Sequence, residues 1–397
     1  MRTLALLCVL LVACVPTAPT APPRQAAPDI QRSKIDIVFS GLIGGSYYKP
    51  NGRDLLVAAL EAIKKEARDT RGDADAPTPA FDGSEEKQLA DFRLFAAAAE
   101  QLAAKNPQLS PSRISGAAIR AMLRLNPDCH NYYRPSVGGA SLLAQTHEDG
   151  EYPRSGYYVP GRAGSLKPGL AAPHRGSNGP ADGDAQIARY GQEAGTLGSG
   201  LGEAGGLQAR LLPGHVGYLS WRSFMDPAVF DDVRRALDRL LAQGARSWLF
   251  DLRDNGGGDG PMQMVSWFVN GGTIWREVDR DGSLTPATAR PEFFLPPEYQ
   301  LPIAIVINGR TGSSPEFFTL ALQQRGRAKV FGTKSVGCLG STALSQLPDG
   351  TVVSITQSVV IGPTSDAPVN NVGITPDVEV SGDVVEVAAA YLRSLVR

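Results

Sequence analysis

The alternation of short apolar runs with helical patterns in the second half of the chain most constrains its fold. Trp248 to Leu252 and Leu301 to Ile307 are apolar runs of strand length, and each leads through a glycine-rich turn into a helical pattern. Val216 to Trp221 predicts another strand, and Pro227 to Leu241 predicts a helix. Strands that alternate with helices usually pair in parallel. The sequence therefore predicts an α/β core with a mostly parallel sheet.

Ser313 lies at one of the predicted strand-to-helix junctions. The turn from Asn308 to Glu316 contains it, and helical spacing of apolar residues follows as far as Gln324. Unpaired N–H groups in the first turn of a helix can stabilise an oxyanion, so a nucleophile fits this position. A plain N-cap fits as well, with Ser313 or Ser314 capping a helix that has proline in its first turn.

The glycine-rich turn from Arg253 to Gly260 follows the other apolar strand. A phosphate-binding loop is one interpretation, but no Gly-Lys-Ser/Thr sequence follows and the dinucleotide glycine spacing is missing. Glycines also let backbone N–H groups approach a ligand closely, as an oxyanion hole requires. Two such turns after two strands can converge on one substrate carbonyl.

Five motifs in order resemble those of the tail-specific, or C-terminal processing, serine peptidases. They are LPGHVGYLSWRSF (212–224), DLRDNGGG (251–258), TGSSPE (311–316), LPDGTVVSIT (347–356) and VGITPD (372–377). LNPDCHNYYRP (125–135) is similar to the segment that ends the family's helical N-terminal domain. The resemblance implies that Ser313 is the nucleophile, and that the N–H groups of Ser314 and Gly257 bind the oxyanion.

The general base departs from the lysine-using branch of the family. Cys338 stands where that branch has its lysine, and Lys334 lies four residues earlier, so a Ser-Lys dyad is disfavoured. The branch similar to tricorn and the retinoid-binding repeats uses a histidine instead. His130 is the only one of the four histidines in a segment where the family could place a base, and imidazole is the commonest base for a serine. A packing or capping role for His130 is equally open, and Asp128 either orients the imidazole or caps a turn.

The resemblance also bears on two cysteines. It implies that the segments holding Cys129 and Cys338 both border the active site, so a disulfide between them is expected, with two unpaired buried thiols as the alternative. Such a disulfide would fix His130 beside Ser313.

The N-terminus has the pattern of an export signal. The apolar stretch from Leu4 to Ala13 is too short to span a bilayer, and Leu11 to Cys14 resembles a bacterial lipobox. We expect cleavage of residues 1–13 and lipidation of Cys14, with an uncleaved anchor as the weaker alternative. Because Val15 is not acidic, the periplasmic side of the outer membrane is favoured as the location.

The remaining segments complete the predicted organisation. Residues 14–34 form a tether, residues 35–135 a small helical N-terminal domain, residues 136–210 a glycine-rich insert, and residues 211–397 the catalytic domain. Helices are expected over 54–67, 87–105 and 110–125. The insert lacks the steady alternation of strands, so a PDZ domain is absent or degenerate.

These features together predict a membrane-tethered serine endopeptidase that cleaves exported proteins or peptides. A relative that binds peptides or ligands without catalysis is the alternative, and an interaction scaffold is a third. The net charge of −1 argues against nucleic acid as a partner. No cofactor and no metal site are expected.

Overall fold

The computed structural model describes residues 29–126, 128–134 and 206–396. Its N-terminal part is a bundle of four helices: α1 (Arg32–Gly45), α2 (Gly52–Asp69), α3 (Gln88–Lys105) and α4 (Pro111–Arg124). The last three confirm the predicted helices. Local caps explain two of their starts, because the side chain of Asn51 accepts the N–H groups of Arg53 and Asp54, and Ser110 accepts the N–H of Arg113.

A six-stranded, mostly parallel sheet forms the core of the second part. The strand order is β11-β8-β7-β4-β3-β2, and only the β2–β3 pair is antiparallel. The bounds are β2 (Gln208–Leu212), β3 (Val216–Ser220), β4 (Ser247–Asp251), β7 (Ile303–Ile307), β8 (Ala328–Gly332) and β11 (Val378–Glu379). The predicted α/β core is confirmed.

Helices cover both faces of this sheet. One core cluster joins it to α6 (Ala228–Ala242), α7 (Pro261–Ser266) and α8 (Ser314–Gln324), and a separate cluster joins the other face to α9 (Val384–Leu395). Every residue of β3, β4 and β7 is buried, as expected for strands covered on two faces.

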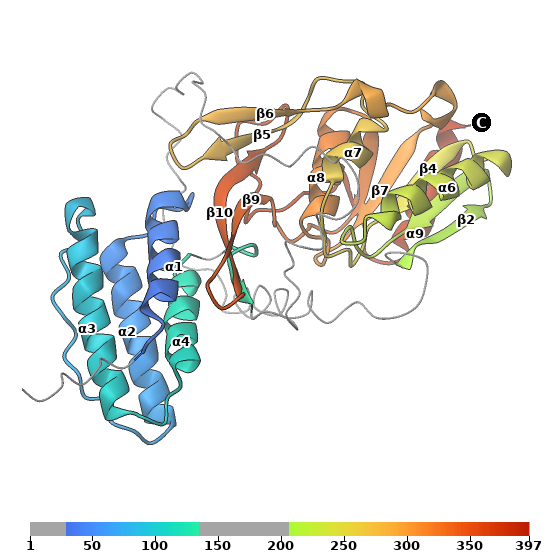
Figure 1. The fold of residues 1–397 in the computed structure, drawn as a ribbon. Coiled ribbons are helices and arrows are strands. Elements are labelled where there is room, and N and C mark those ends of the chain that lie inside the picture. Colours follow the sequence, from blue (N-terminus) through green and yellow to red (C-terminus); the bar gives the residue numbers. More distant parts are fainter. Residues whose placement is uncertain (1–28, 127, 135–205, 397) are drawn as a thin grey trace, which may run out of the picture.

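A second, antiparallel sheet connects the two parts of the molecule. It contains β1 (Tyr132–Arg134), β5 (Thr273–Asp279), β6 (Leu284–Thr288), β9 (Gly340–Gln346) and β10 (Val352–Ile361). β1 follows the helical bundle along the chain and pairs with β10, with Tyr132 opposite Ser354. Val353 and Ile355 of β10 belong to the core of the bundle. The strand β10 lies between the bundle and the rest of the molecule (Figure 1). The segment that precedes β1 is therefore held against the catalytic domain.

Short 3₁₀ turns complete the described structure: η1 (Glu85–Lys87), η3 (Pro291–Phe293) and η4 (Pro297–Tyr299). Helix α1 begins at Arg32, inside the predicted tether, and β2 begins at Gln208, inside the predicted insert. The predicted signal, Cys14 and most of the insert lie outside the described residues. Among the described residues, no helix is both long and apolar enough to cross a membrane.

Candidate active site

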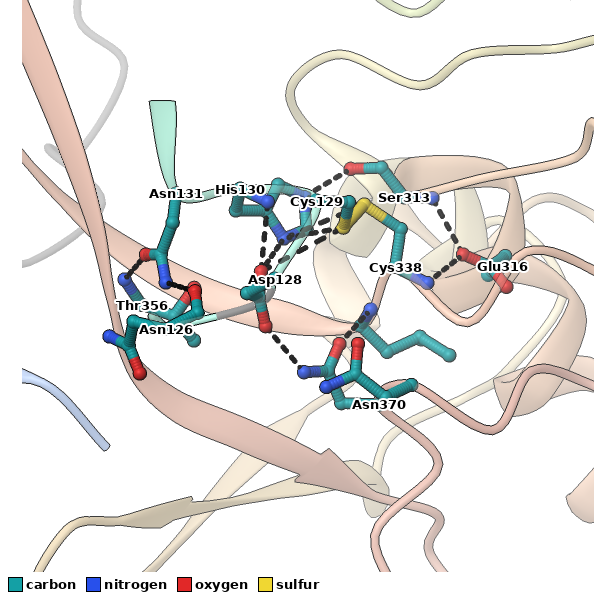
Figure 2. A network of polar contacts seen from close by, with 12 residues as sticks. Asn126, Asp128, Cys129, His130, Asn131, Ser313, Glu316, Cys338, Thr356 and Asn370 are labelled. Atoms are coloured by element: carbon teal, nitrogen blue, oxygen red, sulfur yellow. Dashed lines mark hydrogen bonds and ion pairs between the residues drawn. A yellow bond between two sulfur atoms is a disulfide. The ribbon is translucent and has the colours of Figure 1, made fainter. Parts of the chain in front are cut away.

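The turn between β7 and α8 holds Ser313 in an unusual backbone conformation. Its φ of 67° and ψ of −126° lie in a region that residues with a side chain rarely adopt. Such strain is typical of functional turns and needs support from the surroundings. Ser313 directly precedes the first helical residue, as the N-cap interpretation expects, but its Oγ lies 3.2 Å from Nε2 of His130 (Figure 2).

Glu316 supplies much of that support. Its side chain is fully buried in the first turn of α8, and it accepts the N–H of Ser313 at 2.8 Å. It also accepts the hydroxyl of Ser335 at 2.5 Å and the N–H groups of Gly337 and Cys338, both at 2.7 Å. Burial raises the pKa of Glu316, and the four donors oppose that rise. One carboxylate thus ties the serine turn to the segment that carries Cys338.

His130 is placed by the short segment between α4 and β1. The neighbouring Asn131 donates to the carbonyl of Asn126 at 2.7 Å and accepts the N–H of Thr356 at 2.7 Å, which fixes the segment to β10. The imidazole keeps 18% of its side-chain surface exposed. His130 and Ser313 are 183 residues apart in the sequence, so the fold brings together the two predicted catalytic side chains.

Asp128 lies behind the imidazole and is buried. Its Oδ1 accepts the N–H of His130 at 2.8 Å and is 3.6 Å from Nδ1, too long for a hydrogen bond. Its Oδ2 accepts the hydroxyl of Tyr48 and the amide of Asn370, both at 2.7 Å. Burial alone raises the pKa of Asp128, but the nearby His130 side chain, the bond from Tyr48 and the N–H of His130 outweigh it and hold the pKa at about 2. Asp128 therefore caps the turn and also places a negative charge beside the imidazole.

A disulfide joins Cys129 to Cys338 on one side of His130 (Figure 2). The two Cα atoms are 5.8 Å apart, within the usual range for a disulfide. The Sγ of Cys129 is 3.5 Å from Nδ1 of His130, and the Sγ of Cys338 is 3.4 Å from Nε2. The bond links the segment that holds the imidazole to the segment that Glu316 holds.

The two residues expected to bind an oxyanion lie beside Ser313. A Cβ built on Gly257 would stand 2.6 Å from Cβ of Ser313, so the glycine turn touches the serine. The N–H of Gly257 is engaged, however, since it donates to Oδ1 of Asn255 at 3.0 Å. In this conformation Gly257 does not offer the free donor that the sequence led us to expect, because a local Asx turn takes its N–H. The hydroxyl of Ser314 donates to the carbonyl of Gly258, and its N–H lies in the first turn of α8.

The other candidate bases lie elsewhere. Lys334 is exposed, and among the described residues no hydrogen bond joins its amine to Ser313. His215 is exposed in the turn between β2 and β3, where its Nδ1 lies 2.9 Å from the carbonyl of Gly244. His147 and His174 fall outside the described residues.

Tyr48 and Asn370 are the parts of the site that sequence reasoning missed. Each contacts Asp128 across a long separation in the chain, 80 residues for Tyr48 and 242 for Asn370. No spacing or motif connects residues at such separations.

Part of the chain is similar in sequence to known proteins. Residues 215–380 match the model of peptidase family S41. A carboxyl-terminal-processing protease of Picosynechococcus is 30% identical over 164 residues, which cover 41% of this chain and 38% of that protein. The chloroplastic carboxyl-terminal-processing peptidase 2 of Arabidopsis thaliana is 28% identical over 173 residues, covering 41% of this chain and 31% of that protein.

One solved structure resembles the chain over most of its length. A lipoprotein from Streptococcus agalactiae is 15% identical and aligns with a TM-score of 0.54 over 94% of this chain and all of that one, which shows a shared fold. The chain spans less than two-fifths of the length of the two curated relatives above. The family match covers β3 to β11 and includes Ser313. Residues 215–380, which include Ser313, are therefore similar to peptidase family S41.

Proposed function

We propose that the protein is a serine endopeptidase in which Ser313 is the nucleophile and His130 the general base. The observation that carries the proposal is the 3.2 Å approach of Ser313 Oγ to His130 Nε2. A serine hydroxyl is a poor nucleophile until a base removes its proton, and a neutral imidazole at this distance can accept it. The substrate is a polypeptide, and the chain belongs to the branch of the family that lacks the lysine base.

Each residue of the site has its own step in the proposed reaction. Ser313 Oγ attacks the scissile carbonyl as its proton moves to Nε2 of His130. The N–H of Ser314 stabilises the negative oxygen of the tetrahedral intermediate. His130 then gives the proton to the leaving amine, and a water molecule hydrolyses the acyl-enzyme by the same steps. The charge of Asp128, 3.6 Å from Nδ1, favours the imidazolium that forms in between.

Gly257 can supply the second oxyanion donor once a substrate displaces Asn255 from its N–H. Freeing this donor requires the buried Asn255 side chain to rotate, which also breaks the 2.9 Å bond from its amide to the carbonyl of Trp221.

Three variants test the catalytic assignment. Ser313→Ala and His130→Ala lose nearly all peptide hydrolysis while the fold stays intact, because each removes one partner of the proton transfer. Lys334→Ala is the matched control and keeps most of the activity. If Ser313→Ala turns over like the wild type, the nucleophile is wrong; if Lys334→Ala is the dead variant, the base is lysine.

A serine-directed phosphonate distinguishes the enzyme from a non-catalytic binding relative. Stoichiometric modification at Ser313 supports the peptidase. No modification, under conditions that label a related peptidase, supports the binding protein.

We further propose that the protein is exported and anchored through a lipidated Cys14, on the periplasmic side of the outer membrane. The short apolar stretch before Cys14 supports the proposal, and the disulfide suits an oxidising compartment. Two acyl chains anchor a protein stably where one binds only reversibly. The intact mass of the detergent-extracted protein tests this, and the mass of the unprocessed chain would refute it.

A further inference from the structure

Three potential metal ligands surround a fourth, Nδ1 of His130. The Sγ atoms of Cys129 and Cys338 lie 3.5 Å and 3.7 Å from it, and Oδ1 of Asp128 lies 3.6 Å from it. The Sγ of Cys129 is also 3.8 Å from that Oδ1. We propose that, when the disulfide is reduced, these four side chains bind one thiophilic divalent cation such as Zn²⁺ and thereby switch the peptidase off. The inhibition rests on the proposed function, whereas the binding does not.

The spacing of the donors matches a tetrahedral site. In a tetrahedral zinc site the bonds are about 2.3 Å to sulfur and about 2.0 Å to nitrogen or oxygen. Two ligand atoms of such a site, at least one of them nitrogen or oxygen, then lie roughly 3.3 to 3.6 Å apart. The four distances above lie within a few tenths of an ångström of that range. Two further changes are needed: the two sulfurs have to separate to roughly 3.8 Å, and the Sγ of Cys338 has to come closer to Oδ1 of Asp128. Rotation of the cysteine side chains supplies both movements, while Glu316 and Asn131 hold the backbone.

The chemistry of the donors favours a soft metal. Two thiolates, an imidazole and a carboxylate are ligands that Zn²⁺ and Cd²⁺ accept, whereas Mg²⁺ and Ca²⁺ prefer sites made of oxygen atoms. The side chain of Asp128 is buried, and its Oδ1 already lies 3.6 Å from Nδ1 of His130. Its other oxygen stays bonded to Tyr48 and Asn370, which would orient the carboxylate toward the metal.

The site forms only after a reductant opens the disulfide. A dithiol of the thioredoxin class attacks one sulfur and breaks the bond between Cys129 and Cys338. The dithiol is oxidised to its own disulfide, and the two cysteines become thiols. Each thiol releases its proton to water when it binds the cation. Oxidation of the thiols by a disulfide oxidant expels the metal and restores the original bond.

Metal binding at Nδ1 removes the base. The imidazole of a metal-bound histidine is neutral and carries its remaining proton on the other nitrogen, here Nε2. Nε2 is the atom that faces Ser313 Oγ at 3.2 Å. An N–H at this position cannot accept the serine proton, so the nucleophile stays inactive even though every catalytic side chain is present.

Cobalt titration tests the binding directly, without a peptidase assay. The protein, reduced with a phosphine that does not chelate metals, should bind one Co²⁺ per chain and show the near-ultraviolet charge-transfer absorption of cobalt-bound thiolates. The oxidised protein and the Cys129→Ser/Cys338→Ser variant should show neither. Ser313→Ala should bind cobalt as the wild type does, and Asp128→Asn should bind at least 10-fold more weakly.

The cobalt titration distinguishes a four-ligand metal site from two thiols that happen to bind a metal. If reduced protein gives no charge-transfer band, or if Asp128→Asn and His130→Ala bind cobalt as tightly as the wild type, the proposal is wrong. The result expected is a loss of at least 10-fold in affinity for each, since both residues supply a ligand.

Phosphonate labelling tests the inhibition. Zn²⁺ should slow the labelling of Ser313 in reduced protein at least 100-fold, a chelator should restore it, and Zn²⁺ should leave oxidised protein unaffected. Equal inhibition of both forms would overturn the switch. If Ser313 is never labelled in metal-free protein, the proposed function fails while the cobalt result still decides the metal site.

Discussion

Replacement of Glu316 by glutamine should loosen the serine turn by an amount that the hydrogen bonds allow us to work out. The amide oxygen can take the place of Oε2 and accept the N–H groups of Ser313 and Cys338. The amide nitrogen then faces the hydroxyl of Ser335, which can rotate to accept, and the N–H of Gly337, which cannot. One buried backbone donor is left unpaired, at a cost of about 1–3 kcal/mol. Glu316→Ala leaves three such donors unpaired and should cost about 3 kcal/mol or more.

Guanidinium unfolding followed by tryptophan fluorescence measures these changes. The four tryptophans all lie in the α/β part of the chain, and Trp221 and Trp248 are fully buried there, so the signal reports this domain. Glu292→Gln alters an exposed carboxyl and serves as the control, with a change within about 0.5 kcal/mol.

The same variants should also react more slowly with a phosphonate at Ser313, because the turn no longer has its full support. The reasoning would be refuted if Glu316→Gln unfolded like the control and reacted at the wild-type rate. Slower reaction without loss of stability would show that the carboxylate acts on the turn alone and contributes little to the fold.

Two further predictions follow from residues near Ser313. Asp128 has its pKa depressed from 3.8 to about 2, so it contributes roughly 2 kcal/mol of stability that is present above pH 4 and lost as the pH falls through about 2. Asp128→Asn should be less stable at pH 6 and change less between pH 4 and pH 2, as measured by urea unfolding; an unchanged acid profile would contradict this. Gly257→Ala, at φ 97°, would place a methyl group 2.6 Å from Cβ of Ser313 and should abolish phosphonate labelling. Gly282→Ala, at φ 81° with open space around it, is the matched control and should lose only about 1 kcal/mol of stability through backbone strain.

The spacing of apolar residues correctly predicted the helices and strands whose own sequence shows which side is buried. Helices α2, α3 and α4 and strands β4 and β7 begin and end within a few residues of the predicted bounds. Helix α1 was missed, although its buried residues Ile35, Val38, Phe39 and Leu42 have helical spacing. The antiparallel sheet was missed for a physical reason, since the pairing of β1 with β10 joins segments far apart in the chain and no local pattern selects that partner.

In the candidate site, too, the motifs identified some residues, and others became visible only in the structure. Ser313 and His130 were named from motifs, and the structure brings their side chains to 3.2 Å. The partners of Asp128 were not found, because Tyr48 and Asn370 are polar residues in loops without a distinguishing neighbour. The engagement of the Gly257 N–H was also missed, although Asn255 two residues earlier is the signal that an Asx turn leaves.

Because β1 pairs with β10, a chain that is still being synthesised can become active only after β10 has been made. A ribosome completes residue 130 long before it reaches β10, at residues 352–361, and without that strand the segment that carries the imidazole lacks its pairing partner and the bond from Asn131 to Thr356. On the proposed function, a nascent chain, or one truncated before β10, is harmless to the proteins around it. On the proposed function, the last long strand of the chain therefore completes the active site.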